Sequence, residues 1–492
     1  MNCKGLYALL LCLLCNVSIK AQEAITLEKA LSIAETNSPS LQKAGLSREQ
    51  SRQTLIAQKA ALKAKISLSL APFSYSKGQD FNAQNSDWYK YKSINSSGTF
   101  EVSQPILPTN TTVSLVNTFG WQDVSSDYYG NATSDKSFIN DLYLKLKQPL
   151  FTYNSMKMKL KVLELSVENA EIEYKLKHLF MEQQVTSLFY KVFMAQLNLD
   201  IAREELNNTQ ASRTTIADKV KEGLTANIEL YQADLNLSTA KSTVRNRDVA
   251  LENAKAYFRQ FVGMDLNTPV TVLATIGEVD SLKINMTEAI SYGLKYRMEL
   301  RQRKIDIENE ELNMIKTKAL NKFEGAVSLS FGLIGNDIAP NTIYRNPTQS
   351  LGAAVSFNVP IFDWGERKAR IKAQDAVIKY KEIDLESDRT QIIIDISEIC
   401  RNIENYRAQI EIEKQNQRNA KLAYEISLEK YSNGDLSSMD LNLYQSQLSS
   451  KKISMAQAQI NYKMELLNLK IASLYDFEKG IAVTTISIEN NK

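Results

Sequence analysis

Residues 147–152 read Lys147-Gln148-Pro149-Leu150-Phe151-Thr152, and residues 358–363 repeat this pattern as Asn358-Val359-Pro360-Ile361-Phe362-Asp363. Pro149 and Pro360 are 211 positions apart, and Phe151 and Phe362 keep the same spacing. The same shift relates Gly223 to Gly434, Glu229 to Asp440, and Leu237 to Leu448. One constant shift over roughly 90 residues indicates a tandem duplication of one structural unit.

Each copy of the motif is typical of a corner where a strand ends and a helix begins. Proline has no backbone donor and a fixed φ, which suits the end of a strand. We expect Asp363 to cap the second helix, with Glu366 completing a capping box, and Thr152 to cap the first. Gly365 permits a positive φ, and its counterpart Asn154 is the next most tolerant residue type. The predicted corner residues are Pro149, Phe151, Pro360, Phe362 and Gly365.

Alternating apolar and polar residues precede each corner. Residues 323–362 predict two strands joined by a loop, each about as long as the 9–11 residues that a membrane-spanning strand needs. The first copy, residues 64–151, contains about 48 additional residues with candidate strands at 99–107 and 113–121. Two alternatives stay open for this extra segment: a hairpin added to the sheet, or an external loop.

Very long helices follow each corner. Residues 153–221 contain neither proline nor glycine, which predicts a helix of roughly 100 Å. A break at Gly223 separates it from a second helix over 226–262, and the second copy repeats this with helices over 366–431 and 438–475. Apolar residues recur at steps of three and four, as in coiled coils. Helices of this length need neighbours of equal length.

The composition excludes several classes of function. The net charge is +3 and charged residues make up 23% of the chain, so no strong field favours nucleic acid as a partner. The sequence contains a single histidine, His178, and no phosphate-binding glycine-rich loop. We therefore expect no enzyme activity, no metal site and no cofactor.

The N-terminus has the pattern of an export signal. One lysine precedes a short leucine-rich run, and small residues end at Ala21, which predicts a signal peptide over residues 1–21. The alternative is a lipoprotein signal ending at Cys15, but Leu14 occupies a position where such signals have a small residue. With cleavage after Ala21, Cys400 is the one cysteine left in the mature chain, which excludes a disulfide within it.

The motifs together resemble those of TolC-like outer membrane efflux proteins. Pro360-Ile361-Phe362-Asp363-Trp364-Gly365 is similar to that family's Pro-Leu-Phe-x-x-Gly signature, and Tyr431 with Gly434 and Asp440 is similar to its second motif. The resemblance covers essentially the whole mature chain. It implies a mainly α protein with transmembrane β structure: an internally duplicated long-helix α-barrel plus an antiparallel β-barrel, formed by a homotrimer. Each subunit would give four strands, and twelve strands would close the barrel.

The resemblance also implies functional residues. Gly223-Leu224-Thr225 resembles the tip at which the family docks a periplasmic adaptor (membrane fusion protein). Gly434, Leu436 and Ser437 form the second tip, where an inserted aspartate departs from the pattern. Glu229 and Asp440 match the family's constriction acids; the alternative for each is a solvated or ion-paired carboxylate. Three subunits would place six carboxylates in a ring that favours cations.

The sequence thus predicts the outer membrane channel of a tripartite efflux or type I secretion system, with a periplasmic tunnel, driven by an inner-membrane RND or ABC transporter. The alternative is a periplasmic coiled-coil scaffold or adaptor without a pore. The expected partners are the adaptor, the transporter and outer membrane lipid. The expected order along the chain is: signal peptide 1–21; first helix 22–63; strands and extra segment 64–151; helical hairpin 152–262; equatorial linker 263–285; first helix of the second repeat 286–322; β-hairpin 323–362; helical hairpin 363–475; and C-terminal tail 476–492.

Overall fold

The computed structural model describes residues 24–83, 86–128, 131–274, 282–433 and 435–483. The predicted signal peptide, Gly434, part of the equatorial linker and the end of the tail lie outside these residues. The described chain forms two compact units: the first combines Met1–Leu46, Ile172–Arg301 and Glu386–Lys492, and the second combines Ser47–Glu171 and Gln302–Leu385. The two longest helices each contribute to both units.

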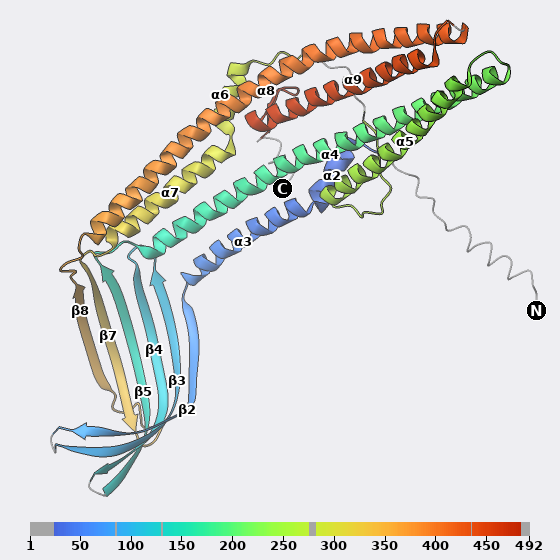
Figure 1. Cartoon of the computed structure of the whole chain (residues 1–492). Helices are drawn as coiled ribbons and strands as arrows, with labels where there is room; N and C mark the ends of the chain where they lie inside the picture. Colours follow the sequence, from blue (N-terminus) through green and yellow to red (C-terminus); the bar gives the residue numbers. More distant parts are fainter. Residues whose placement is uncertain (1–23, 84–85, 129–130, 275–281, 434, 484–492) are drawn as a thin grey trace, which may run out of the picture. The chain divides into compact units, whose positions relative to one another are not determined.

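The second unit contains a six-stranded antiparallel sheet with the order β2-β3-β4-β5-β7-β8 (Figure 1). The strands are β2 (Lys65–Asn82), β3 (Asp87–Ile106), β4 (Thr111–Tyr128), β5 (Asn131–Leu150), β7 (Glu324–Asp337) and β8 (Thr348–Asn358). The expectation of four strands is therefore wrong. The extra residues of the first repeat form β3 and β4, which pair along their whole length and lie inside the sheet. Long cross-strand pairing on both sides satisfies backbone groups that an external loop would leave to water.

One face of this sheet is apolar and the other is polar. Because directly paired residues share a face, the register places six apolar side chains in one row across the sheet. The row reads Ile66, Val102, Leu115, Leu144, Phe331 and Leu351. The next row, on the opposite face, reads Ser67, Glu101, Val116, Tyr143, Gly332 and Ser350. The apolar face is uncovered in the single chain, and Leu351 is 84% exposed.

The helices follow the predicted pattern, with one additional break in each repeat. The long hairpins are α4 (Ser155–Lys221) with α5 (Asn227–Val262), and α8 (Glu366–Asn433) with α9 (Ser438–Ser473). The helix expected over 22–63 is divided at Ser38 into α2 (Leu27–Asn37) and α3 (Pro39–Ala61), because proline cannot donate to the preceding turn. Its counterpart divides at Arg297 into α6 (Met286–Tyr296) and α7 (Met298–Ala319).

The two strand-to-helix corners are built differently, and the predicted cap at Thr152 is wrong. In the first repeat the left-handed residue is Phe151, with a φ of 58°, and the side chain of Asn154 caps α4 by accepting from the Lys157 N–H at 2.8 Å. In the second repeat Gly365 has the expected positive φ of 81°. Glycine has no capping side chain, so Asp363 accepts from the N–H groups of Gly365 and Arg367 instead.

These two backbone N–H groups lower the pKa of Asp363, and the hydrogen bond from Arg367 makes the larger contribution. The predicted capping box is wrong, because the Glu366 carboxylate accepts from Arg370 and Asn321 and not from the corner backbone. Trp364 and Phe362 pack edge to face next to this corner, with ring centroids 4.7 Å apart. The corner therefore keeps its motif in both repeats while its cap moves by two positions.

Asn154→Ala is expected to destabilise the protein by about 1–2 kcal/mol, because it removes the cap of α4. The same amide also donates to the Leu107 and Pro108 carbonyls in the β3–β4 turn. Thermal unfolding of the detergent-solubilised protein measures the change. Thr152→Ala is the control and should alter stability by no more than about 0.5 kcal/mol. Equal losses in the two variants would restore Thr152 as the cap.

The core of the first unit lies where α2, α4 and α5 meet. Ala30, Val185, Phe258 and Val262 are fully buried there, and the rings of Phe189 and Phe258 lie 6.5 Å apart. Two short parallel strands, β1 (Ala24–Ile25) and β6 (Thr271–Val272), pair beside it. The C-terminal residues add an antiparallel hairpin of β9 (Tyr475–Asp476) and β10 (Ile481–Ala482). This unit also holds the tips of both helical hairpins.

Candidate functional site: the helix-hairpin tips

The first tip is a tight turn between α4 and α5. Gly223 has a φ of 73°, and the Leu224 N–H donates to the Lys219 carbonyl at 2.8 Å, which closes the end of α4 as a left-handed helix cap does. Leu224 is 70% exposed. Helix α5 then begins after Ala226, which has no side chain able to cap it. The predicted docking residues Gly223, Leu224 and Thr225 thus form a small, outward-facing turn.

The second tip has a stronger cap. Asp435 donates its N–H to the Lys430 carbonyl at 2.9 Å, which repeats the bond made by Leu224 in the first tip. Ser437 accepts from the Asp440 N–H at 3.1 Å, and its hydroxyl donates to the Asp440 carboxylate at 2.7 Å. Of the predicted tip residues, Leu436 is half-buried and Ser437 is the cap of α9, while Gly434 lies outside the described residues.

The two candidate constriction acids therefore have different surroundings. Glu229 lies in the first turn of α5 and is half-buried, and no side chain caps that helix. Asp440 lies in the first turn of α9 and is exposed, and its carboxylate accepts a hydrogen bond from the Ser437 hydroxyl. Both acids complement the positive end of a helix dipole. In Asp440 this local capping role is established by geometry, whereas a pore-facing role stays a prediction.

Contacts near the tips join helices that lie far apart in the sequence. The hydroxyls of Ser212 on α4 and Tyr431 on α8 are 3.2 Å apart, and the Lys219 ammonium lies 5.6 Å from the Tyr431 ring. Arg213 on α4 forms an ion pair with Asp234 on α5 at 2.8 Å, and this carboxylate raises the pKa of Arg213. Sequence reasoning named Tyr431 through its spacing from Gly434 but missed Ser212, Arg213 and Asp234. In the sequence these three residues are marked only by being polar positions of a long helix, which many other residues share.

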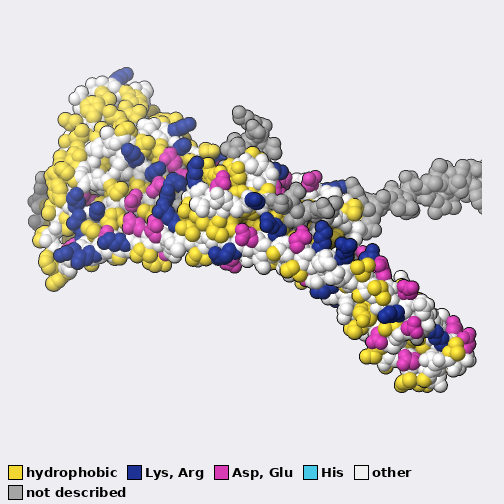
Figure 2. Space-filling view, turned by 90° about the horizontal axis from the view of Figure 1, so that it is seen from above, with side chains coloured by type: hydrophobic (Ala, Val, Ile, Leu, Met, Phe, Trp, Pro, Cys, Tyr) yellow, Lys and Arg dark blue, Asp and Glu magenta, His cyan; other side chains and the backbone are white. Residues whose placement is uncertain are grey.

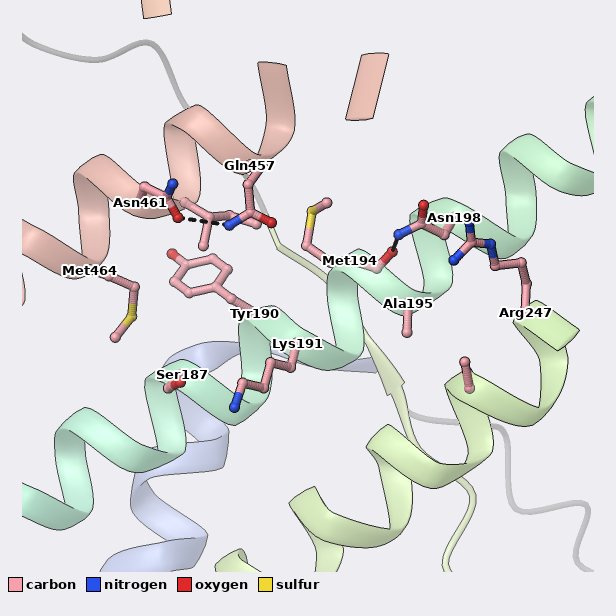
Figure 3. A pocket seen from close by; sticks show the side chains of 12 residues that line it. Ser187, Tyr190, Lys191, Met194, Ala195, Asn198, Arg247, Gln457, Asn461 and Met464 are labelled. Atoms are coloured by element: carbon pink, nitrogen blue, oxygen red, sulfur yellow. Dashed lines mark hydrogen bonds between the residues drawn. The ribbon is translucent and has the colours of Figure 1, made fainter. Parts of the chain in front are cut away.

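A cavity of about 380 Å³ lies between α4, α5 and α9 within the first unit (Figure 3). Tyr190, Met194 and Met464 line it, and Gln457 donates to Asn461 at 2.7 Å along its wall. Burial raises the pKa of Tyr190, with a smaller contribution from the charge of Glu478. Ser187 and Lys191, one turn apart on α4, also line the cavity.

Metal-ligand chemistry adds no further site among the described residues. Within the described part of the chain, no group of three or more histidine, cysteine, aspartate or glutamate side chains can hold a metal ion. Basic and acidic side chains are mixed over the face shown in Figure 2. Cys400 is buried in α8, and burial raises the pKa of its thiol.

None of the described helices is apolar over a stretch long enough to cross a membrane.

Part of the chain matches a known protein family. Residues 326–473 match the family described as outer membrane efflux protein. The chain is 21% identical over 212 residues to the probable outer membrane lipoprotein SilC of Salmonella typhimurium, covering 42% of this chain and 45% of that protein. It is 24% identical over 211 residues to protein CyaE of Bordetella pertussis, covering 42% and 43%. The chain thus matches less than half the length of these relatives.

The fold has solved counterparts. The Campylobacter jejuni CmeC outer membrane channel superimposes with a TM-score of 0.69 at 15% identity, covering 94% of this chain and 89% of that one. The fold is therefore that of the outer membrane channels. Residues 326–473 thus match the outer membrane efflux protein family, and the chain as a whole shares the fold of outer membrane channels such as CmeC.

Proposed function

We propose that the chain is the outer membrane channel of a tripartite efflux or type I secretion system. The observation that carries this proposal is the two-faced sheet, in which an unbroken apolar row crosses all six strands and faces away from a polar row. Apolar-out and polar-in alternation is the pattern of a strand wall between lipid and a water-filled lumen. A periplasmic scaffold or adaptor gives no reason for an exposed apolar face of this extent.

The assembly that completes this wall is a homotrimer. Strands β2 and β8 are the two edges of the sheet, and a membrane does not tolerate unpaired edges. Pairing β8 of one copy with β2 of the next closes the sheet, so that three copies give eighteen strands instead of the twelve that the resemblance implies. The long helices of three copies then supply each other with neighbours of equal length and form the periplasmic tunnel.

The tips are the proposed contact with the partners. A periplasmic adaptor docks at Gly223, Leu224 and Thr225 and at Leu436 and Ser437, and an inner-membrane RND or ABC transporter supplies the energy. Proteins similar to this chain support the assignment: one is named an outer membrane channel and another an outer membrane lipoprotein. Glu229 and Asp440 form the acidic constriction at the tip end of the tunnel.

Conductance in planar lipid bilayers tests the channel and the acidic ring together. The wild type should give small cation-selective currents, and Glu229→Gln/Asp440→Asn should lower the permeability ratio of K⁺ to Cl⁻ severalfold because six carboxylates are neutralised. The control is Asp375→Asn/Glu382→Gln, which makes the same change of charge on α8 instead of on α5 and α9. Unchanged selectivity in the first variant would exclude Glu229 and Asp440 as the constriction acids. Folded trimers without current would refute the channel.

A further inference from the structure

The polar face of the sheet contains a hollow lined by hydrogen-bond donors. It has a volume of about 600 Å³ and lies across β4, β5, β7 and β8. Its polar side chains are two lysines on β5 and four hydroxyls on the neighbouring strands: Lys145, Lys147, Thr112, Ser114, Ser328 and Ser330. No carboxylate is among the residues that line it. Ammonium groups and hydroxyls arranged in this way are suited to an anion.

The register shows how this lining arises. Lys145 pairs with Ser114 on one side and with Ser330 on the other, and the same row continues through Ser103 to Lys65 at the edge of the sheet. Lys147 lies one row further along, between Thr112 and Ser328. Two neighbouring rows of the polar face therefore contain lysines, and the residues paired with these lysines on the adjacent strands are small and carry hydroxyls.

The lysines are not neutralised by the described residues. No described carboxylate lies within the 4.0 Å of an ion pair to Lys65, Lys145 or Lys147, and the Lys145 ammonium lies 5.3 Å from the Tyr143 ring. Of the acids that share this face, Glu101 and Asp141 lie one and two rows away from the Lys145 row, and Glu324 lies two rows away from the Lys147 row. Their separation leaves a local excess of positive charge at the hollow.

A glycine keeps the hollow open. Gly352 is paired with Ser330, and a Cβ atom at position 352 would lie 2.5 Å from the Ser330 hydroxyl oxygen. Any larger residue would therefore cover this hydroxyl. Ser330, unlike Ser114, which donates to Ser103 at 3.1 Å, is left facing the hollow.

We propose that this hollow is a binding zone for small multivalent oxyanions that move along the polar face of the sheet. The inference rests on the proposed channel, because the face becomes a lumen wall only in that assembly. Lysines supply long-range attraction over a screening length of about 8 Å at physiological ionic strength, and the hydroxyls supply directional donors. The zone would favour anionic solutes at the sheet, in contrast to the acidic residues at the tips.

Equilibrium dialysis of labelled citrate against the detergent-solubilised full-length protein tests the zone without requiring current. At low salt the wild type should bind citrate, and Lys145→Gln/Lys147→Gln should weaken binding about tenfold through the loss of two charge-assisted contacts. Lys145→Arg/Lys147→Arg should retain binding. The control is Lys77→Gln/Lys92→Gln, a cross-strand lysine pair on the opposite face of the same sheet.

The outcomes separate this inference from the channel itself. Wild-type protein that conducts but binds no citrate, or equal losses in the two glutamine variants, would overturn the anion zone and leave the channel. Citrate binding that depends on Lys145 and Lys147, in folded protein that carries no current, would keep the zone and refute the channel. Block of the current by citrate added on the sheet side alone, lost in Lys145→Gln/Lys147→Gln, would support both.

Discussion

Replacing Gly263 by alanine is expected to destabilise the protein by about 2–5 kcal/mol, which combines left-handed strain with a steric clash. Gly263 ends α5 with a φ of 80°, and its N–H donates to the Arg259 carbonyl at 3.0 Å. A Cβ atom there would lie 2.3 Å from the carbonyl oxygen of Asn37, at the end of α2. Because the obstacle is backbone, no side-chain rotation relieves the clash, and α2 must shift away from the core it covers.

Gly223→Ala is the matched control for this prediction. Gly223 also has a left-handed backbone, with a φ of 73°, but no atom lies within 4 Å of the position that a Cβ would occupy there. Only the backbone strain applies, about 1–2 kcal/mol. Thermal unfolding and the yield of folded protein should show a far larger loss for the variant at position 263. If the two variants lost equal stability, the packing of α2 against the end of α5 would not contribute.

The duplication and the long helices were predictable because each depends on signals close together in the chain. A constant spacing of 211 between the corner motifs and the absence of proline and glycine over 153–221 locate α4 and α8 within a few residues. The caps were less predictable. Thr152 has the residue type of a cap, but the left-handed turn at Phe151 brings Asn154 to the first turn of α4 instead. That choice depends on backbone direction at the corner.

The number of strands required information that no local pattern contains. Alternation marked residues 99–107 and 113–121 as candidate strands, but a strand joins a sheet only through its partners. The pairing of Leu115 with both Val102 and Leu144 decides the matter, and these contacts span different parts of the first repeat. The lysine row of the polar face depends on the same register, so it could not be recognised before the sheet was assembled.

The tips contain one contact that the sequence could predict and one that it could not. The Ser437-x-x-Asp440 spacing is a capping signal present in the sequence, within a segment that the family resemblance marks as a docking tip. The contact between Ser212 and Tyr431, in contrast, joins α4 to α8 across more than 200 residues and has no local signal. Pore-facing and docking roles for these residues stay predictions, since they depend on partners and copies beyond a single chain.

The orientation of the sheet yields the sharpest test of its place in the membrane. Leu115 and Val116 are neighbours in the central strand β4, and their side chains point to opposite faces. Leu115 is 42% exposed within the apolar row, whereas Val116 lies in the polar row between Glu101 and Tyr143. If the apolar face contacts lipid, Leu115→Arg should destabilise the inserted protein by about 2–4 kcal/mol, the usual cost of arginine near the bilayer midplane.

Val116→Arg should cost much less, because an arginine on the lumen side stays hydrated and faces the carboxylate of Glu101. Both changes replace an aliphatic residue by arginine one position apart, so strand propensity and chain length are matched. Reversible urea unfolding in lipid vesicles measures the two free energies, and heat-modifiable migration reports assembly in cells. A larger loss for Val116→Arg would mean that the faces are reversed, and equal small losses would mean that neither face contacts lipid. The difference between the two variants therefore tests the membrane wall directly, independently of current, substrate or pump.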